Sequence, residues 1–118
     1  MQINERTVGD VVILDLIGKM TLSESHEMLK DTVSALVSKG CRKIILNQEK
    51  TPYIDSAGLR EIVAAYTKLS RLGGKLKLLY PSDRFNDLLE ITKLRTLFET
   101  YNNEAEAVAS FSSRSPTV

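Results

Sequence analysis

The chain has 118 residues, of which 42% are hydrophobic and 26% are charged, and its formal net charge is +1. This length fits a single domain that can bury a substantial core, and the near-zero net charge argues against nucleic acid as a partner. We find no apolar run long enough to cross a membrane and no secretory signal peptide at the N-terminus. Cys41 is the only cysteine, so no disulfide can form within the chain, which suits a reducing cytoplasm.

The start of the chain predicts a β-hairpin. Residues 2–8 alternate loosely between polar and apolar side chains, and residues 11–17 form a richer apolar run. The pair Gly9-Asp10 separates the two runs, and such a pair is typical of a tight hairpin turn. We therefore expect the chain to open with two antiparallel strands.

An amphipathic helix of about four turns is predicted from Leu22 to Val37. Apolar side chains recur there at helical spacing, and most charged side chains fall on the other side. Thr21 or Ser23 can cap the start of this helix, and Gly40 can end it. His26 falls on the apolar stripe, where a half-buried structural histidine is more common than a ligand.

Strands and helices alternate through the rest of the chain. The predicted elements are a strand at 43–46, a helix at 57–72, a strand at 75–80, a helix opening at 81–83, an edge strand within 97–101, and a last helix capped by Asn102-Asn103 with Ala105, Val108 and Phe111 facing inward. This order predicts an α/β domain over residues 1–111, followed by a flexible tail over residues 112–118. We expect a mixed sheet of four to five strands, with about four helices packed mainly on one face.

The segment Tyr53-Ile54-Asp55-Ser56-Ala57-Gly58-Leu59 is the most informative part of the chain. It joins a buried strand to a helix, so we expect Ser56 at or just before a helix N-terminus and near the surface. Free backbone N–H groups and the positive end of the helix dipole favour an anionic group there. Two interpretations stay open on these residues alone: Asp55 and Ser56 are simple helix caps, or Ser56 is a phosphorylation site.

No catalytic, metal or nucleotide site can be assembled from the sequence. His26 is the only histidine, so no second one is available to share a metal or to complete a triad with a nucleophile. No Gly-rich phosphate loop follows a predicted strand. We therefore expect neither an enzyme nor a protein that holds a metal or cofactor.

The remaining polar candidates receive structural interpretations. Asn47 ends a predicted strand, and we expect it to hydrogen-bond across the loop before Ser56 or to face a partner. Asp83, Arg84 and Glu90 are expected on a solvated helix face, where they carry no evident chemistry.

The chain resembles the STAS family, and within it the bacterial anti-sigma factor antagonists, from Gln2 to Phe111. The likeness rests on the order and spacing of four stretches, which are the hairpin ending in Ile17-Gly18, Gly40 to Asn47, Tyr53 to Leu59, and Gly73 to Leu78. The resemblance implies a protein that binds an anti-sigma factor, itself a serine kinase, and thereby frees a sigma factor. It also implies that the kinase phosphorylates the first serine of the Asp-Ser-x-Gly-Leu motif, here Ser56, that phosphorylation ends the binding, and that a serine phosphatase resets the cycle.

The resemblance further implies a partner surface around Ser56. The residues expected on this surface, besides Ser56 itself, are Tyr53, Asp55, Ala57, Gly58, Arg60, Thr21 and Ser23. Ala57 and Gly58 are small and would let a kinase approach closely. We expect a kinase of the GHKL (histidine-kinase-like) type, a monomer when unbound, and a cytoplasmic location. A STAS module in a signalling scaffold or a transporter-associated complex is the alternative.

Three features depart from the usual family pattern. Arg60 stands where many members have glycine, and Lys19 replaces a common acidic residue. The loop over residues 19–23 is slightly longer than usual. Because Arg60 and the Lys19 loop are both expected near Ser56, these departures bear on partner choice more than on the fold.

Overall fold

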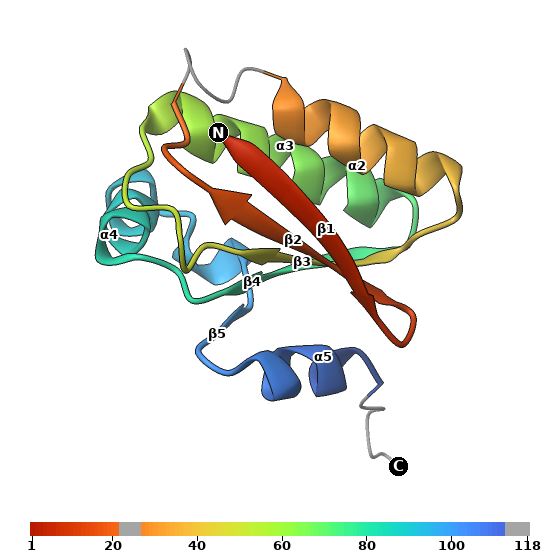
Figure 1. Cartoon of the computed structure of the whole chain (residues 1–118). Helices are drawn as coiled ribbons and strands as arrows, with labels where there is room; N and C mark the ends of the chain where they lie inside the picture. Colours follow the sequence, from red (N-terminus) through yellow and green to blue (C-terminus); the bar gives the residue numbers. More distant parts are fainter. Residues whose placement is uncertain (22–26, 113–118) are drawn as a thin grey trace.

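The computed structural model describes residues 1–21 and 27–112 and shows an α/β domain around a five-stranded mixed sheet (Figure 1). The strands, in their order across the sheet, are β1 (Gln2–Val8), β2 (Val11–Ile17), β3 (Lys43–Asn47), β4 (Lys75–Leu79) and β5 (Thr100–Tyr101). β1 pairs with β2 in antiparallel register, whereas the pairs from β2 to β5 are parallel. The predicted class and the opening hairpin are confirmed.

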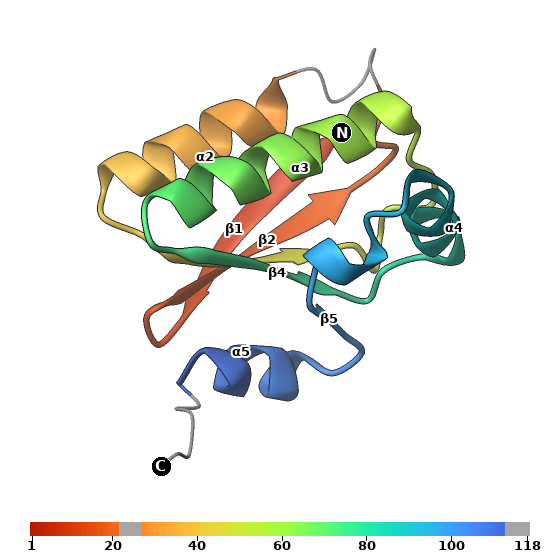
Figure 2. The same cartoon turned by 180° about the vertical axis from the view of Figure 1, so that it is seen from behind.

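Helices cover the two faces of the sheet unequally (Figures 1 and 2). On one side lie α2 (Met28–Ser38), α3 (Ser56–Arg71) and α4 (Asp83–Thr92), and on the other lies α5 (Glu104–Ser112). A short 3-10 helix, η1 (Arg95–Leu97), precedes β5. The prediction that the helices pack mainly on one face is confirmed. None of the helices within residues 1–21 and 27–112 is long and apolar enough to cross a membrane.

The main core lies between the sheet and the helices α2, α3 and α4. The inward side chains of the central strands are Leu14, Leu16, Ile44, Leu46, Leu76 and Leu78. A smaller cluster beneath α5 consists of Val11, Ile13, Ile45, Leu79 and Ala107. Because both faces of the central strands are covered, these strands are continuous apolar runs in the sequence and do not alternate.

Lys77 is a buried cation within β4 that the sequence analysis did not single out. Only 3% of this residue is exposed. Its Nζ atom lies 2.8 Å from Ser110 Oγ, 3.2 Å from a carboxylate oxygen of Glu99 and 4.5 Å from the ring centroid of Phe111. A buried ammonium group requires such partners, so Lys77 ties α5 to the sheet.

The described start of α2 differs from the predicted helix start. α2 begins at Met28, after Glu27, whose backbone is left-handed with φ 60° and which provides no side-chain cap. Thr21 lies well before Met28 and does not cap α2. The other predicted cap, Ser23, and His26 lie outside the described residues.

The C-terminal elements also depart from the prediction. β5 is shorter than the edge strand expected within residues 97–101, because a 3-10 turn precedes it. In α5, Ala105 is exposed and Ala107 is fully buried, so part of the inner stripe is displaced by two residues. Two predicted inner residues do pack on the smaller cluster, Val108 and Phe111. The tail predicted over residues 112–118 lies outside the described residues except for the last residue of α5.

Candidate functional site

Ser56 is the first residue of α3, and it is exposed. β3 ends at Asn47, and residues 48–55 lead from the carboxyl end of this parallel strand to the helix. The backbone N–H groups of the first turn of a helix have no acceptor within the helix. The position predicted for Ser56, at the surface and at a helix start, is confirmed.

Asp55 is the cap of α3. Its backbone is extended, with φ −107° and ψ −175°, and its Oδ1 atom accepts a hydrogen bond of 3.0 Å from the backbone N–H of Gly58. A capping carboxylate of this kind contributes about 1 kcal/mol to helix stability. The interpretation as a simple helix cap is therefore confirmed for Asp55. The cap bond is made by Asp55 and not by the Ser56 hydroxyl.

The loop after β2 is hydrogen-bonded to the segment that leads to Ser56. The backbone N–H of Met20 donates to the carbonyl oxygen of Tyr53 at 2.9 Å, and the N–H of Asp55 donates to the Met20 carbonyl at 3.2 Å. Met20 and Ile54 thereby form an isolated parallel bridge. The expectation that the Lys19 loop lies near Ser56 is confirmed, and the backbone before Ser56 is fixed on one side. Thr21, which follows this bridge, is half-buried.

Gly58 permits the close contact between α3 and this loop. It is buried, and a Cβ atom at its position would lie 2.3 Å from the carbonyl oxygen of Met20 and 2.9 Å from Cγ1 of Ile54. The sequence analysis expected the small size of Gly58 to admit a kinase. That expectation is corrected, since Gly58 faces inward and its missing side chain makes room for the protein's own backbone. Ala57, beside it, is half-buried.

Arg84 contacts the segment just before Ser56 from the side of α4. Its Nε atom donates to the carbonyl oxygen of Ile54 at 3.3 Å, and its Cζ atom lies 5.3 Å from the ring centroid of Tyr53. Ile54 is buried, whereas Tyr53 is 40% exposed. Arg84 is exposed on α4, as expected, and its two contacts with the segment before Ser56 were not predicted from the sequence. The contact could have been anticipated from the parallel pairing of β3 and β4, because this pairing brings the helix after β4 beside the loop after β3.

Three exposed cations lie on segments that adjoin the Ser56 segment. Arg60 is exposed and lies four residues after Ser56, on the same side of α3. Lys19, also exposed, precedes the Met20 bridge, and Arg84 approaches from α4. This arrangement favours negative charge at the site, in addition to the effect of the helix N-terminus.

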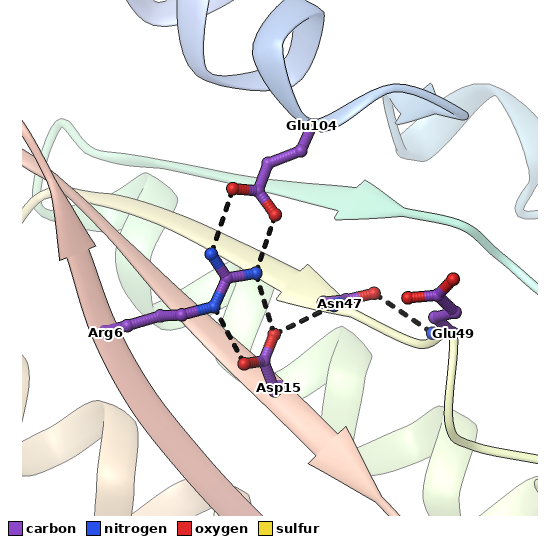
Figure 3. A network of polar contacts seen from close by, with 5 residues as sticks. All are labelled: Arg6, Asp15, Asn47, Glu49 and Glu104. Atoms are coloured by element: carbon purple, nitrogen blue, oxygen red, sulfur yellow. Dashed lines mark hydrogen bonds and ion pairs between the residues drawn. The ribbon is translucent and has the colours of Figure 1, made fainter.

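A polar network on the α5 side of the sheet holds the start of the loop that leads to Ser56 (Figure 3). Arg6 Nε lies 2.8 Å from Asp15 Oδ2, and Arg6 Nη2 lies 2.6 Å from Glu104 Oε1. Asn47 donates to Asp15 Oδ1 at 2.8 Å and accepts from the backbone N–H of Glu49 at 3.0 Å. Asn47 therefore contacts its own loop start and β2, as one branch of the sequence prediction anticipated.

Arg6 shifts the titration of both acidic members of this network. Its hydrogen bonds lower the pKa of Asp15 below the ordinary value and outweigh the opposing effect of partial burial. The same guanidinium lowers the pKa of Glu104, again chiefly through hydrogen bonding. The carboxylates of Asp15 and Glu104 are therefore ionised at neutral pH.

The folded protein is expected to lose stability on acidification through this network. The pKa values of Asp15 and Glu104 are lower in the folded state, so their ionised forms stabilise the fold above the unfolded-state values of roughly 4. This stabilisation disappears as the pH falls from there to the folded-state values. Urea unfolding near pH 7 and near pH 3 should show a smaller decrease in unfolding free energy for Arg6→Gln than for the wild type. Equal decreases would contradict the prediction.

Arg84→Ala is expected to lower the unfolding free energy by about 0.5–1 kcal/mol, the usual contribution of an exposed cation–π contact. It should also shift the amide resonances of residues 53–56, because Arg84 holds the Ile54 carbonyl and the Tyr53 ring. Arg95→Ala is a matched control, since Arg95 is exposed and its guanidinium pairs with Glu90. NMR spectra and urea titrations of both variants check this. If Arg95→Ala moved the same resonances equally, the assigned role of Arg84 would be wrong.

Within residues 1–21 and 27–112, no group of three or more His, Cys, Asp and Glu residues is placed to hold a metal ion. The geometry is that of a small α/β domain with an exposed serine at a helix start. The STAS domain family model matches residues 2–107. The chain therefore belongs to the STAS family, and to the anti-sigma factor antagonists within it.

Individual relatives agree with this assignment. BtrV of Bordetella bronchiseptica, provisionally assigned as an anti-sigma factor antagonist, is 30% identical over 94 residues, which cover 80% of this chain and 81% of BtrV. The crystal structure of TM1081 from Thermotoga maritima, with the same provisional assignment, gives a TM-score of 0.84 at 28% identity and covers 92% of each chain. Phosphorylated SpoIIAA of Bacillus shares the fold, with a TM-score of 0.75 at 21% identity over 93% of this chain and 99% of SpoIIAA.

Proposed function

We propose that this protein is an anti-sigma factor antagonist that is switched off by phosphorylation of Ser56. The unmodified protein binds an anti-sigma factor, a serine kinase of the GHKL type, and a sigma factor is released. The kinase transfers the γ-phosphoryl group of ATP to Ser56 Oγ, which loses its proton, and ADP leaves. The complex then dissociates, and a serine phosphatase hydrolyses the phosphate ester. The cycle belongs in the cytoplasm, where ATP and RNA polymerase are present.

The observation that carries this proposal is an exposed Ser56 on a backbone held from several sides. Asp55 caps the helix that Ser56 begins, Met20 bonds to the segment before it, and Arg84 contacts the same segment from α4. A kinase substrate must present its hydroxyl in a reproducible geometry, and rigid support achieves this. That SpoIIAA, which has the same fold, exists in a phosphorylated form also supports the proposal.

The charge added by phosphorylation acts at the interface and not in the fold. A phosphoserine carries roughly −1.5 to −2 charges at neutral pH. The N-terminus of α3 offsets this by about 0.3–1 kcal/mol, while the neighbouring Asp55 carboxylate opposes it. Inside a protein interface, an unpaired charge costs about 3–5 kcal/mol. The modification therefore releases the partner and leaves the domain folded.

The partner surface follows from the accessible residues next to Ser56 in the chain. We propose that Tyr53, Ala57 and Arg60 contact the kinase directly, because Tyr53 and Arg60 are exposed and Ala57 is half-buried beside the serine. Asp55 and Gly58 shape the surface by capping α3 and by admitting the Met20 loop. Further candidates, proposed from the family pattern, are Thr21 and Ser23.

The test is phosphate mapping on the purified protein incubated with ATP and its cognate anti-sigma kinase. We expect one phosphate per chain, located on Ser56 by peptide mass spectrometry, and none in Ser56→Ala. Phosphate on another residue would exclude this switch. Binding of the partner without any phosphate transfer would instead favour a STAS module in a scaffold or a transporter-associated complex.

A further inference from the structure

A groove between α2 and α3 lies on the outer surface of the helical layer. The hollow between the two helices measures about 210 Å³, and a wider, open hollow of about 610 Å³ adjoins it along α3. Both are lined by Ala64 and Lys68. Val33 contributes to the apolar floor, and Leu72, which is 45% exposed, forms the far wall. An aliphatic side chain can bury against this apolar lining.

The borders of this groove are basic. Lys68 and Arg71 lie along the exposed side of α3, and Lys30 faces them from α2. Among the described residues that line the two hollows, none carries a carboxylate. Lys68 donates an exposed hydrogen bond of 2.8 Å to Ser34 Oγ. An occupant that complements the groove therefore combines an aliphatic side chain with neighbouring carboxylates.

The C-terminal half of α4 presents that combination. Ile91 is 74% exposed, the largest exposure given for a large hydrophobic side chain in the described part of the chain. Asp87 and Glu90 are exposed beside it, four and one residues earlier in the helix. Glu90 pairs with Arg95 at 2.7 Å, but both side chains are mostly exposed. Because such exposed ion pairs contribute little to stability, Glu90 can exchange Arg95 for a cation of another molecule.

We propose that the groove of one molecule binds α4 of a second copy of this chain. Ile91 enters the apolar floor at Ala64, while Asp87 and Glu90 meet Lys68 and Arg71. The spacing agrees, since each charged pair is three residues apart on a helix, which corresponds to about 4.5 Å along the axis. The contact joins two different surfaces, so it is heterologous and repeats head to tail into a ring or an open row.

This contact is separate from the proposed switch at Ser56. It leaves Ser56 accessible on the molecule that supplies the groove. Lys68 lies 12 residues after Ser56 in α3, about 18 Å along the helix axis. A row of molecules therefore presents several Ser56 surfaces together, which raises the apparent affinity of a partner with more than one binding site. Because a single groove and one half-helix form a small interface, the association is weak and dilute protein remains monomeric.

Sedimentation velocity over roughly 20 µM to 1 mM, a range that covers weak association, tests this on the wild type. We expect the sedimentation coefficient to rise with concentration and this rise to shrink in high salt.

Ile91→Ser removes the anchor, and Ala64→Gln fills the groove with a residue that helices accept. Each variant keeps the net charge and should associate about tenfold to 100-fold more weakly. Val8→Ser, which removes an exposed aliphatic side chain at the hairpin turn, is the matched control and should behave as the wild type.

An equimolar mixture of the Ile91→Ser and Ala64→Gln variants gives the decisive result. Ile91→Ser keeps its groove and Ala64→Gln keeps its α4 surface, so the mixture should form a species of two chains and nothing larger. A wild type that stays monomeric to about 1 mM, an Ile91→Ser variant that associates normally, or a mixture that stays monomeric would each overturn the proposal.

Discussion

Replacing Ser56 by Asp is expected to weaken binding to the anti-sigma kinase by about 10²- to 10³-fold, without loss of the fold. The carboxylate would occupy the first position of α3, where the helix dipole tolerates negative charge. At the interface, the same charge would be buried without a partner. Isothermal titration calorimetry with the cognate kinase measures the affinity, and thermal unfolding monitors the fold.

Two variants separate the effect of position from the effect of charge. Ser56→Ala should bind as the wild type does, because it introduces no charge, although it cannot be phosphorylated. Ser70→Asp adds the same charge on the same helix, 14 residues further on and about 21 Å away along the axis. It should bind normally. If Ser70→Asp weakened binding as much as Ser56→Asp, general electrostatics would explain the result and the local switch would be rejected.

Patterns between near neighbours in the chain predicted most of the fold and the location of Ser56. The strands β2 to β4 follow from short apolar runs, and α3 follows from apolar side chains at helical spacing. The Asp-Ser pair before that stripe marked the helix start, and the structure has Asp55 as the cap and Ser56 as the first helical residue. These features depend on local backbone chemistry, so a single sequence contains them.

Contacts between distant segments were harder to predict. Arg84 reaches Ile54 across 30 residues, and Arg6 reaches Glu104 across 98. Neither pair has a spacing that indicates a contact, because the strand order and the side of the sheet decide which segments meet. Lys77 was missed for the same reason, since its partners Glu99 and Ser110 become neighbours only when α5 packs beneath the sheet.

The sequence motif predicted the position of Gly58 but not its structural role. The motif placed a glycine three residues after Asp55, and small size alone suggested access for a kinase. The structure gives another cause, because the Met20 carbonyl occupies the place where a Cβ atom would stand. The glycine therefore joins two segments that are close in space and 38 residues apart in the sequence.

Gly58→Ala is accordingly expected to lower the unfolding free energy by about 1–3 kcal/mol, as overpacking does. The direction of this change in unfolding free energy is informative. Alanine is favoured over glycine inside helices by about 1 kcal/mol, so it would stabilise α3 if space allowed. Here the added Cβ would lie 2.3 Å from a backbone oxygen, so α3 and the Met20 loop must separate. Since that loop bonds to the segment before Ser56, binding to the kinase should also weaken.

Ala35→Gly is the matched control for Gly58→Ala, because Ala35 is exposed within a helix, α2, and reports helix propensity alone. It should cost about 0.5–1 kcal/mol and leave the amide resonances of residues 19–21 and 53–56 unchanged, whereas Gly58→Ala should shift them. Urea unfolding and NMR spectra of both variants provide the comparison. A stabilised Gly58→Ala protein with unchanged resonances would mean that the loop yields freely, and the rigid presentation of Ser56 would then need another cause.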